Sequence, residues 1–407
     1  MKWAIIGVYL ILYGFEAVVA YLNLKSGKKG IPDRLQDVYN PERYRQWLAY
    51  HVSNQRFALA QQGFNLVFLV FLLLAGFFPW LDAAVSARTG QPLLQTLFFL
   101  GIFQTILAIL EIPFKIYRIF ILENRFGFNR TGKGTFIKDL VLGYLTAMIL
   151  GGMLVAVVNW LFLRYSENIW LFAASAWGAV SAIILLFFAF LNKVFLRLFN
   201  KFTPLPAGTL RTKIETLAAA SGFSLKAISV MDATKRSAKL NAFFTGLGRT
   251  KEVVLFDSLL EKMSEDEVVS VLAHELGHAL NKDTWRLVAF QIAGLAYYAL
   301  FVGLLLQTPG FFTPFGFSGL HFGFAFVLLA ILLKPLDLLL DIPINAYMRW
   351  AESRADSFSA ARTSGQSLIA ALKVLSRENL VNLNPHPLAV FLYYNHPPVN
   401  ERVRALE

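Results

Sequence analysis

Seven stretches of the chain are apolar enough and long enough to cross a lipid bilayer. A membrane-spanning helix needs about 20 mostly apolar residues. Such runs occur at residues 3–22, 63–81, 93–112, 140–163, 169–191, 286–306 and 322–341. The first run is too long for the apolar region of a signal peptide, and no small-residue cleavage site follows it, so we expect it to be retained as a span. The pattern predicts a polytopic protein with about seven transmembrane helices.

The chain between residues 200 and 285 has the polar pattern of a soluble region. Pro204 and Pro206 break the helix that the fifth apolar run begins. Ser264 and Glu267 have the spacing of a capping box, which predicts a further helix starting there. The intervening pattern predicts a short helix at 208–221 and strands at 227–231, 240–245 and 251–256. We therefore expect a small sheet packed against the capped helix.

The composition supports a membrane protein. Of the 407 residues, 56% are hydrophobic and only 16% are charged, whereas soluble domains are nearer a quarter charged. The chain has no cysteine, so neither disulfides nor thiolate ligands are available. Any bound metal must then be held by histidine and carboxylate groups, a set for which zinc is the expected ion.

The net charge of +12 is distributed among the loops and forms no single basic stripe, so we expect no nucleic-acid partner. The second and fourth loops contain only Arg88 and Arg164, and the loop 307–321 has no Lys or Arg. The first and third loops contain Lys25, Lys28, Lys29, Arg34, Arg43, Arg45, Arg56, Lys115, Arg118, Arg125, Arg130, Lys133 and Lys138. By the positive-inside rule, the N-terminus faces outward, and these two loops, residues 193–285 and the C-terminal tail face the cytoplasm.

A metal-binding motif lies in the helix that Ser264 begins. His274 and His278 are four residues apart, so on a helix their imidazoles face the same way and can bind one ion. Glu275 lies beside them, where it can act as general base toward a zinc-activated water. Gly277 weakens the helix slightly but leaves room for a closely packed partner. The alternative is an ordinary amphipathic helix, although chance produces this motif in such a chain only roughly once in a few hundred cases.

A catalytic zinc needs a third protein ligand, which the motif does not contain. The other histidines are His51, His321, His386 and His396, and the carboxylates after the motif include Asp283, Asp337, Asp341, Glu352 and Asp356. Glu352 and Asp356 are the best candidates, because their spacing puts two carboxylates on one helix face. The alternative for this pair is a solvated acidic face beside Arg349 and Arg354.

Several motifs resemble those of integral-membrane zinc metallopeptidases of the CAAX prenyl endopeptidase family. Residues 352–356 are similar to the ExxAD segment of that family. The other matching pieces follow in the family's order from about residue 120: Glu123 with Phe126, Gly127, Phe128, Asn129 and Thr131; Asn241, Ala242 and Phe243; Asn345 with Arg349; and His396, Pro397 and Pro398 with Arg402. The chain is identified as a member of this family, and we expect a bacterial one.

The resemblance implies roles around one Zn²⁺ per chain. His274, His278 and Glu352 would bind the ion, and Glu275, His396 and Asp356 would be the catalytic residues. Asp356 would orient a histidine ligand by hydrogen bonding its other ring nitrogen. Behind the ligands, Asn345 and Arg349 would support the site, with Arg349 holding Glu352.

The resemblance also implies substrate contacts. Asn241, Ala242 and Phe243 would form an edge strand that pairs with the substrate backbone. His396 would hydrogen bond the substrate carbonyl or its oxyanion, as could Arg402. Two of these residues have simpler alternatives, because His396 before two prolines could merely cap a turn and Asn241 could close a strand.

These expectations describe a mainly α membrane protein with a small α+β zinc metalloprotease lobe. The expected parts are an N-terminal transmembrane domain of five spans (1–199), the soluble part of the metallopeptidase domain (200–285), two further transmembrane helices (286–341) and the C-terminal part of that domain (342–407). The location expected is a bacterial inner membrane rather than the endoplasmic reticulum, with the site on the cytoplasmic side.

The predicted function is hydrolysis of peptide bonds near the C-terminus of lipid-modified proteins, inside an enclosed chamber that the resemblance implies. The partners would be the lipid bilayer and a peptide or protein substrate, prenylated or membrane-embedded. One alternative is quality control of misfolded membrane proteins, as in the related heat-shock metalloproteases of the HtpX type. Another is a transporter or membrane scaffold with a structural metal.

Overall fold

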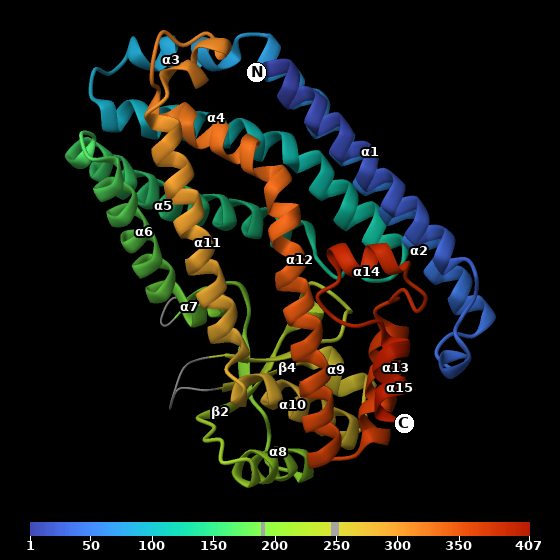
Figure 1. Cartoon of the computed structure of the whole chain (residues 1–407). Coiled ribbons are helices and arrows are strands. Elements are labelled where there is room, and N and C mark those ends of the chain that lie inside the picture. Colours follow the sequence, from blue (N-terminus) through green and yellow to red (C-terminus); the bar gives the residue numbers. More distant parts are fainter. Residues whose placement is uncertain (189–191, 246–251) are drawn as a thin grey trace.

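The computed structural model describes residues 1–188, 192–245 and 252–407, and most of them are helical (Figure 1). Seven helical segments in the described part are long and apolar enough to cross a membrane. They are α1 (Lys2–Gly27), α2 (Pro41–Leu74), α4 (Pro92–Ile116) with its π-helical extension (Tyr117–Glu123), α5 (Lys133–Tyr165), α6 (Ile169–Leu186), α11 (Asp283–Leu306) and α12 (Phe322–Arg362). The prediction of about seven transmembrane helices is confirmed.

The second predicted span, residues 63–81, is wrong in its extent. The chain turns at Gly76, whose φ of 69° suits glycine, so α2 ends at Leu74 and α3 (Phe77–Ser86) starts beyond the turn. The spanning helix instead begins at Pro41, where the Asn40 side chain accepts a hydrogen bond from the backbone N–H of Arg43. The apolar pattern hides the break because α3 buries its own apolar face at the end of the bundle.

The seventh predicted span, 322–341, is the first half of a much longer helix. The 41 residues of α12 run without interruption from the membrane helices into the lobe (Figure 1), so the expected boundary between residues 341 and 342 lies inside this helix. The change from apolar to polar composition there marks a change of environment and not the end of the helix. The end of the fifth predicted span, at 189–191, lies outside the described residues.

The lobe contains a four-stranded sheet of order β1-β2-β4-β3. The strands are β1 (Phe202–Pro204), β2 (Ala227–Met231), β3 (Ala242–Thr245) and β4 (Glu252–Phe256). The pairing of β2 with β4 is parallel and the other two pairings are antiparallel. The sequence pattern predicts β2, β3 and β4 but misses β1. This strand contains Pro204, and a proline is tolerated there because β1 lies at the edge of the sheet. The opposite edge strand is β3.

Short helices complete the lobe. They are α7 (Asn192–Phe199), α8 (Thr209–Ala220), α9 (Asp257–Lys262), α10 (Glu265–Leu280), α13 (Gly365–Glu378), α14 (Pro387–Tyr393) and α15 (Val399–Leu406). The capping box predicted for α10 is present, with Ser264 and Glu267 exchanging their hydrogen bonds. α10 packs on the lower half of α12, where a Cβ built at Gly277 would lie 3.1 Å from the Cα of Ala355. Gly277 is thus the close-approach position that the motif suggested.

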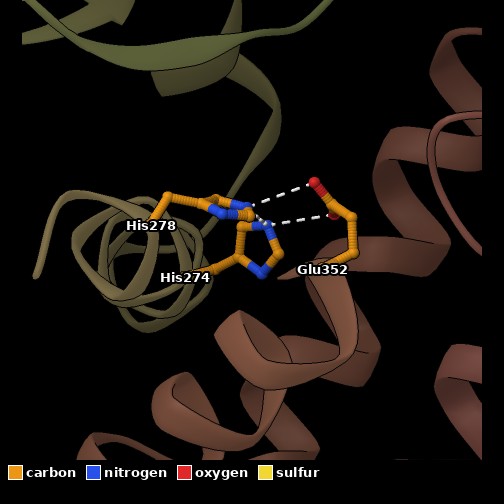
Figure 2. A group of neighbouring side chains, drawn as sticks. All are labelled: His274, His278 and Glu352. Atoms are coloured by element: carbon orange, nitrogen blue, oxygen red, sulfur yellow. Dashed lines mark hydrogen bonds and ion pairs between the residues drawn. The ribbon is translucent and has the colours of Figure 1, made fainter. Parts of the chain in front are cut away.

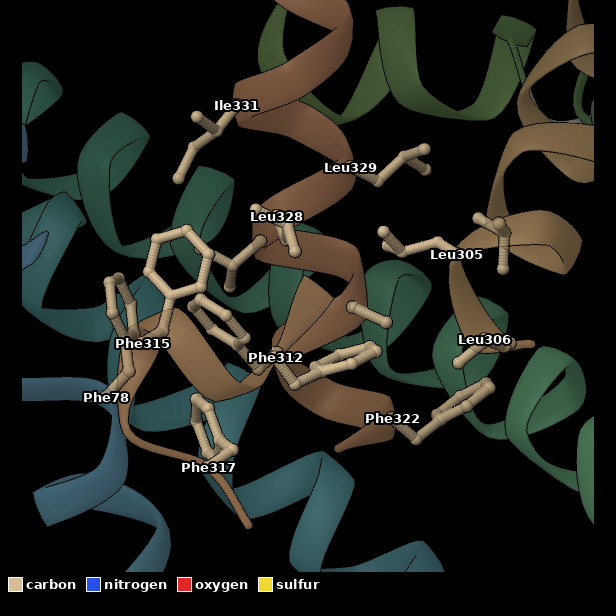
Figure 3. Close-up of a cluster of buried hydrophobic side chains, with 14 of the residues drawn as sticks. Phe78, Leu305, Leu306, Phe312, Phe315, Phe317, Phe322, Leu328, Leu329 and Ile331 are labelled. Atoms are coloured by element: carbon tan, nitrogen blue, oxygen red, sulfur yellow. The ribbon is translucent and has the colours of Figure 1, made fainter. Parts of the chain in front are cut away.

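The membrane helices have a core of their own at the end away from the lobe. Phe312 and Phe324 are completely buried there, and Phe324 contacts Phe78 of α3. Figure 3 shows Phe312 and Phe78 in this cluster. This aromatic cluster joins α3, the segment after α11 and the start of α12, and it therefore fixes the upper end of the helix that carries the site.

Candidate metal centre

The packing of α10 on α12 brings His274, His278 and Glu352 together (Figure 2). Glu352 Oε1 lies 3.1 Å from His278 Nε2, Glu352 Oε2 lies 3.3 Å from His274 Nε2, and the two Nε2 atoms are 3.2 Å apart. The histidines come from one face of α10, and the glutamate comes from the facing turn of α12.

These separations are close to those between the ligand atoms of one zinc ion. Ligand atoms bonded to zinc at about 2.0–2.1 Å lie roughly 3.3–3.4 Å apart in tetrahedral geometry. Glu352 is only 2% exposed, and its Oε2 has no hydrogen-bond donor among the described residues. A buried carboxylate that faces two imidazole nitrogens, one with each oxygen, is the arrangement that a cation would complete.

Asp356 lies behind His274. Its Oδ1 is 2.8 Å from His274 Nδ1, which leaves the Nε2 of the ring directed at Glu352. Arg402 donates to both oxygens of Asp356, at 2.6 and 2.8 Å, and its Nη1 is 3.6 Å from Glu352 Oε2. The guanidinium of Arg402 is therefore mostly engaged by the carboxylates around the metal group, although it also lines the adjoining cavity.

Asp283 lies behind His278, with its Oδ2 3.0 Å from His278 Nδ1. The sequence motifs predict no role for Asp283 as a histidine partner, because it is only one of eight acidic residues that follow the motif. Lys282 adopts a left-handed conformation with φ 58°, which turns the chain sharply between α10 and α11 and points Asp283 back to the motif. The sequence feature that could have indicated this contact is a carboxylate five residues after the second histidine.

Burial and the carboxylates have opposite effects on His274. Burial alone lowers its pKa, but Asp356 and Glu352 outweigh burial and raise the pKa of His274 to about 9 when no cation is present. For Glu275, burial raises the pKa above its ordinary value. Burial lowers the pKa of His396 below its ordinary value.

A cavity of about 400 Å³ opens beside the metal group. Glu275 and His396 line it together with Asn241 and Ala242 at the start of β3. His396 is half-exposed, with its Nε2 3.2 Å from Glu352 Oε1 and its Nδ1 2.7 Å from Asn395 Oδ1. A buried glutamate, an imidazole and a strand edge thus share one cavity with the metal group.

Phe243 lies in β3 beyond these two residues and does not line that cavity. Asn345 and Arg349 lie on α12 and face α14: Asn345 donates to the carbonyl of Leu392, and Arg349 donates to those of Val390 and Tyr394. They hold the segment leading to His396, and no contact of Arg349 with Glu352 is among the described interactions.

The other three histidines lie away from the metal group. His51 stacks on Trp47, His386 caps α14, and His321 lies 2.8 Å from Asp82 at the opposite end of the bundle. The described residues thus contain one group of this kind, in which α10 supplies two members and α12 supplies one.

Both halves of the chain match known families. Residues 20–201 match the model for the CAAX prenyl protease N-terminal region with five membrane helices, and residues 204–407 match the model for peptidase family M48. The chain is 32% identical to the CAAX prenyl protease 1 homolog of Arabidopsis thaliana, covering 99% of this chain and 96% of the relative.

It is 29% identical to CAAX prenyl protease 1 of Saccharomyces cerevisiae, covering 100% of this chain and 95% of the relative. The crystal structure of S. mikatae Ste24p has the same fold, with a TM-score of 0.93 at 28% identity over 100% of this chain and 99% of that one.

Proposed function

The chain belongs to peptidase family M48, with the five-helix N-terminal region of CAAX prenyl proteases, and from this premise we propose that it cleaves lipid-modified proteins near their C-terminus. It is an integral, multi-pass membrane zinc metallopeptidase. The matched relatives are named CAAX prenyl proteases, which does not favour quality control of misfolded membrane proteins, and membership of a peptidase family does not favour a transporter or scaffold.

The observation that carries the proposal is the metal group of His274, His278 and Glu352 with Glu275 beside it. Glu352 lies on α12, the helix that the lobe shares with the membrane domain. We assign the first three residues as the ligands of one Zn²⁺. The ion, when bound, supplies a Lewis acid for the scissile carbonyl and lowers the pKa of water. Proton transfer, stabilisation of the oxyanion and orientation of the ligands come from residues of the chain.

Glu275 takes a proton from the attacking water and returns it to the leaving amine, as a general base and then a general acid. His396 donates a hydrogen bond from its imidazole to the carbonyl oxygen as negative charge develops there. Asp356 keeps the Nε2 of His274 directed at the metal position, and Arg402 neutralises the buried charge of Asp356.

In this proposal the substrate backbone pairs with the edge of β3 opposite β4, which has no neighbouring strand among the described residues. β3 is an edge strand, and Asn241 and Ala242 at its start line the cavity beside Glu275. Main-chain hydrogen bonds to such an edge hold an extended peptide with little dependence on its side chains. Specificity must then come from a neighbouring site.

A second cavity supports a lipid-bearing substrate. It has a volume of about 1000 Å³ and lies between α4, α5 and residues 236–239 of the lobe. Leu107, Ile112 and Leu140 are among its apolar walls, while Arg236 and Lys239 line its polar end. Lys239 is two residues before Asn241, so the cavity adjoins the strand proposed to bind peptide. This volume is at the upper end of small-molecule sites and is ample for one isoprenyl chain.

We also propose that the lobe faces the cytoplasm, where the positive-inside rule puts the basic loops. The α1–α2 loop contacts the lobe through Arg34 with Glu407 and Asp37 with Lys373, and the α4–α5 loop contacts it through Arg130 with Arg236. The two most basic loops therefore share a side with the lobe. A bacterial inner membrane stays our prediction for its location, while the compared relatives come from a plant and a yeast.

The test compares two substrates on the purified protein in detergent or nanodiscs. One is a peptide with a farnesylated cysteine three residues from its C-terminus, and the other is the same peptide without the lipid. We expect zinc-dependent cleavage of the farnesylated peptide and a much lower kcat/KM for the plain one. Cleavage of an unfolded membrane protein in preference to both peptides would contradict the proposal and favour quality control.

A further inference from the structure

We propose that Asp283 is a positioning residue for His278, and that Tyr347 and Arg354 hold it in place. The first residue of one membrane-spanning helix and two residues of another would then set the direction of the second zinc imidazole. This inference rests on the ligand assignment made above but is independent of the identity of the substrate.

The contacts of the two histidines are alike. His274 Nδ1 lies 2.8 Å from Asp356, and His278 Nδ1 lies 3.0 Å from Asp283. A carboxylate that accepts the Nδ1–H of an imidazole selects the tautomer whose Nε2 has a free lone pair. Both Nε2 atoms face Glu352, at 3.3 and 3.1 Å, so each ring is held between a carboxylate behind and the ligand carboxylate in front.

Asp283 is itself firmly held. It is 3% exposed, and its Oδ1 accepts hydrogen bonds from the Tyr347 hydroxyl at 2.8 Å and from the Arg354 guanidinium. Arg354 stacks on the ring of Trp350, 4.3 Å from its centroid. With Oδ1 occupied by these two donors, only Oδ2 is directed at His278. The orientation of the Asp283 carboxylate is therefore fixed, and its hydrogen bond fixes the orientation of the His278 imidazole.

This contact links the metal group to the membrane helices. Asp283 begins α11, and Tyr347 and Arg354 lie on α12 below its apolar half. His274 is oriented by Asp356 of α12, which Arg402 of α15 holds, whereas His278 is oriented from the junction of α11 with α12. Separation of these two helices would turn the His278 ring away from the ion.

The experiment measures zinc affinity of the full-length protein in detergent by competition with a chelator. We expect Asp283→Ala to weaken zinc binding about 10- to 100-fold, the usual cost of losing a carboxylate behind a histidine ligand. Tyr347→Phe removes only the hydroxyl, so it should weaken binding less. Cobalt substituted for zinc should show an altered visible absorption spectrum in Asp283→Ala, because the geometry of one ligand changes.

Asp82→Ala is the matched control. It breaks another aspartate–histidine contact, with His321 at 2.8 Å, at the far end of the bundle. We expect this variant to bind zinc with wild-type affinity, and a loss equal to that of Asp283→Ala would overturn the specific role of Asp283.

Wild-type zinc affinity in a folded Asp283→Ala protein would likewise overturn the proposal. If that variant does not fold, wild-type affinity in both Tyr347→Phe and Asp283→Asn overturns it instead. Failure of the ligand assignment is distinguishable, because Glu352→Ala would then leave zinc binding unchanged. Failure of the proposed lipid substrate would leave every zinc measurement as predicted.

Discussion

Each imidazole of the metal centre lies between two carboxylates. Glu352 faces the Nε2 atoms of both rings, while Asp356 and Asp283 each accept at one Nδ1. Three buried carboxylates around two histidines are costly unless cations join them. Arg402 and Arg354 supply part of that positive charge, and a bound divalent ion would supply more. The residues around the site are thus arranged for a divalent ion more than for stability of the metal-free protein.

Glu275→Gln should abolish turnover and keep the metal. The amide cannot accept a proton from water, so we expect kcat to fall by about 10²- to 10⁴-fold or more, the range for loss of a general base. The measurement is hydrolysis of a peptide substrate together with the zinc content of the same preparation. Glu265→Gln, in the exposed first turn of the same helix, is the control. An active Glu275→Gln protein would refute the assignment.

Zinc affinity should rise with pH. Without a cation, burial lowers the pKa of His274 but the carboxylates raise it to about 9, above the ordinary 6.5. Below that pH the ring holds a proton that must leave before the nitrogen can bind metal. We expect the apparent affinity to increase from pH 6.5 to about 9 and to level off above it. Chelator competition at several pH values measures this, and an affinity that falls with rising pH would contradict the sign.

At the scale of elements, the close packing of α10 on α12 fixes the distance between histidine and glutamate ligands. Gly277→Val should separate these helices, because even a Cβ would lie 3.1 Å from the backbone Cα of Ala355. We expect a loss of about 1–3 kcal/mol in stability, typical of overpacking, and weaker zinc binding. Thermal unfolding and metal content report the two effects.

Gly294→Val is the matched control for this substitution. Gly294 lies in α11, and a Cβ there meets no atom within 4 Å. The control should show the small loss of stability that a β-branched residue causes in a helix, but no change in zinc content. Equal zinc loss in both variants would mean that the approach of α10 to α12 is not what sets the ligand distance.

The cavity between α4 and α5 can be filled from Gly143, where a Cβ meets no atom within 4 Å. Gly143→Phe should raise KM for a farnesylated peptide several-fold and leave hydrolysis of the plain peptide unchanged. Gly134→Phe puts the same ring on the same helix, outside the residues that line this cavity. If the two variants behave alike toward the lipid-bearing peptide, the cavity does not hold the lipid.

At the scale of the whole molecule, α12 joins the aromatic cluster at one end of the bundle to Glu352 and Asp356 at the other. Its 41 residues are long enough to span the membrane and still contribute Glu352 to the metal group, so the helix bundle and the lobe share one scaffold. The lobe's second ligand helix, α10, leads directly into α11, which starts at Asp283.

The absence of cysteine in the chain makes its orientation simple to measure. A single cysteine can be introduced for labelling. Ser26, in the last turn of α1, is buried, so Lys29 in the following loop is a better position for this cysteine. We expect a membrane-impermeant maleimide added outside intact cells to react with Ser318→Cys, in the loop after α11, and not with Lys29→Cys. The opposite pattern would put the lobe outside.

The sequence by itself determined the membrane helices, the face shared by His274 and His278, the cap at Ser264 and three of the four strands. These features depend on apolar length, on the helical repeat and on short-range hydrogen bonds, all of which are local. Motif resemblance added Glu352 and Asp356, which residue patterns alone could not separate from a solvated acidic face.

Only the tertiary structure decided which carboxylates meet which nitrogens. The contact of Asp283 with His278 depends on a left-handed residue at Lys282, and that of Glu352 on how closely α10 approaches α12 at Gly277. The continuity of α12 beyond its apolar half and the pairing of β1 also required the structure. These features arise from chain reversals and helix packing between distant segments, which no local pattern of residues records.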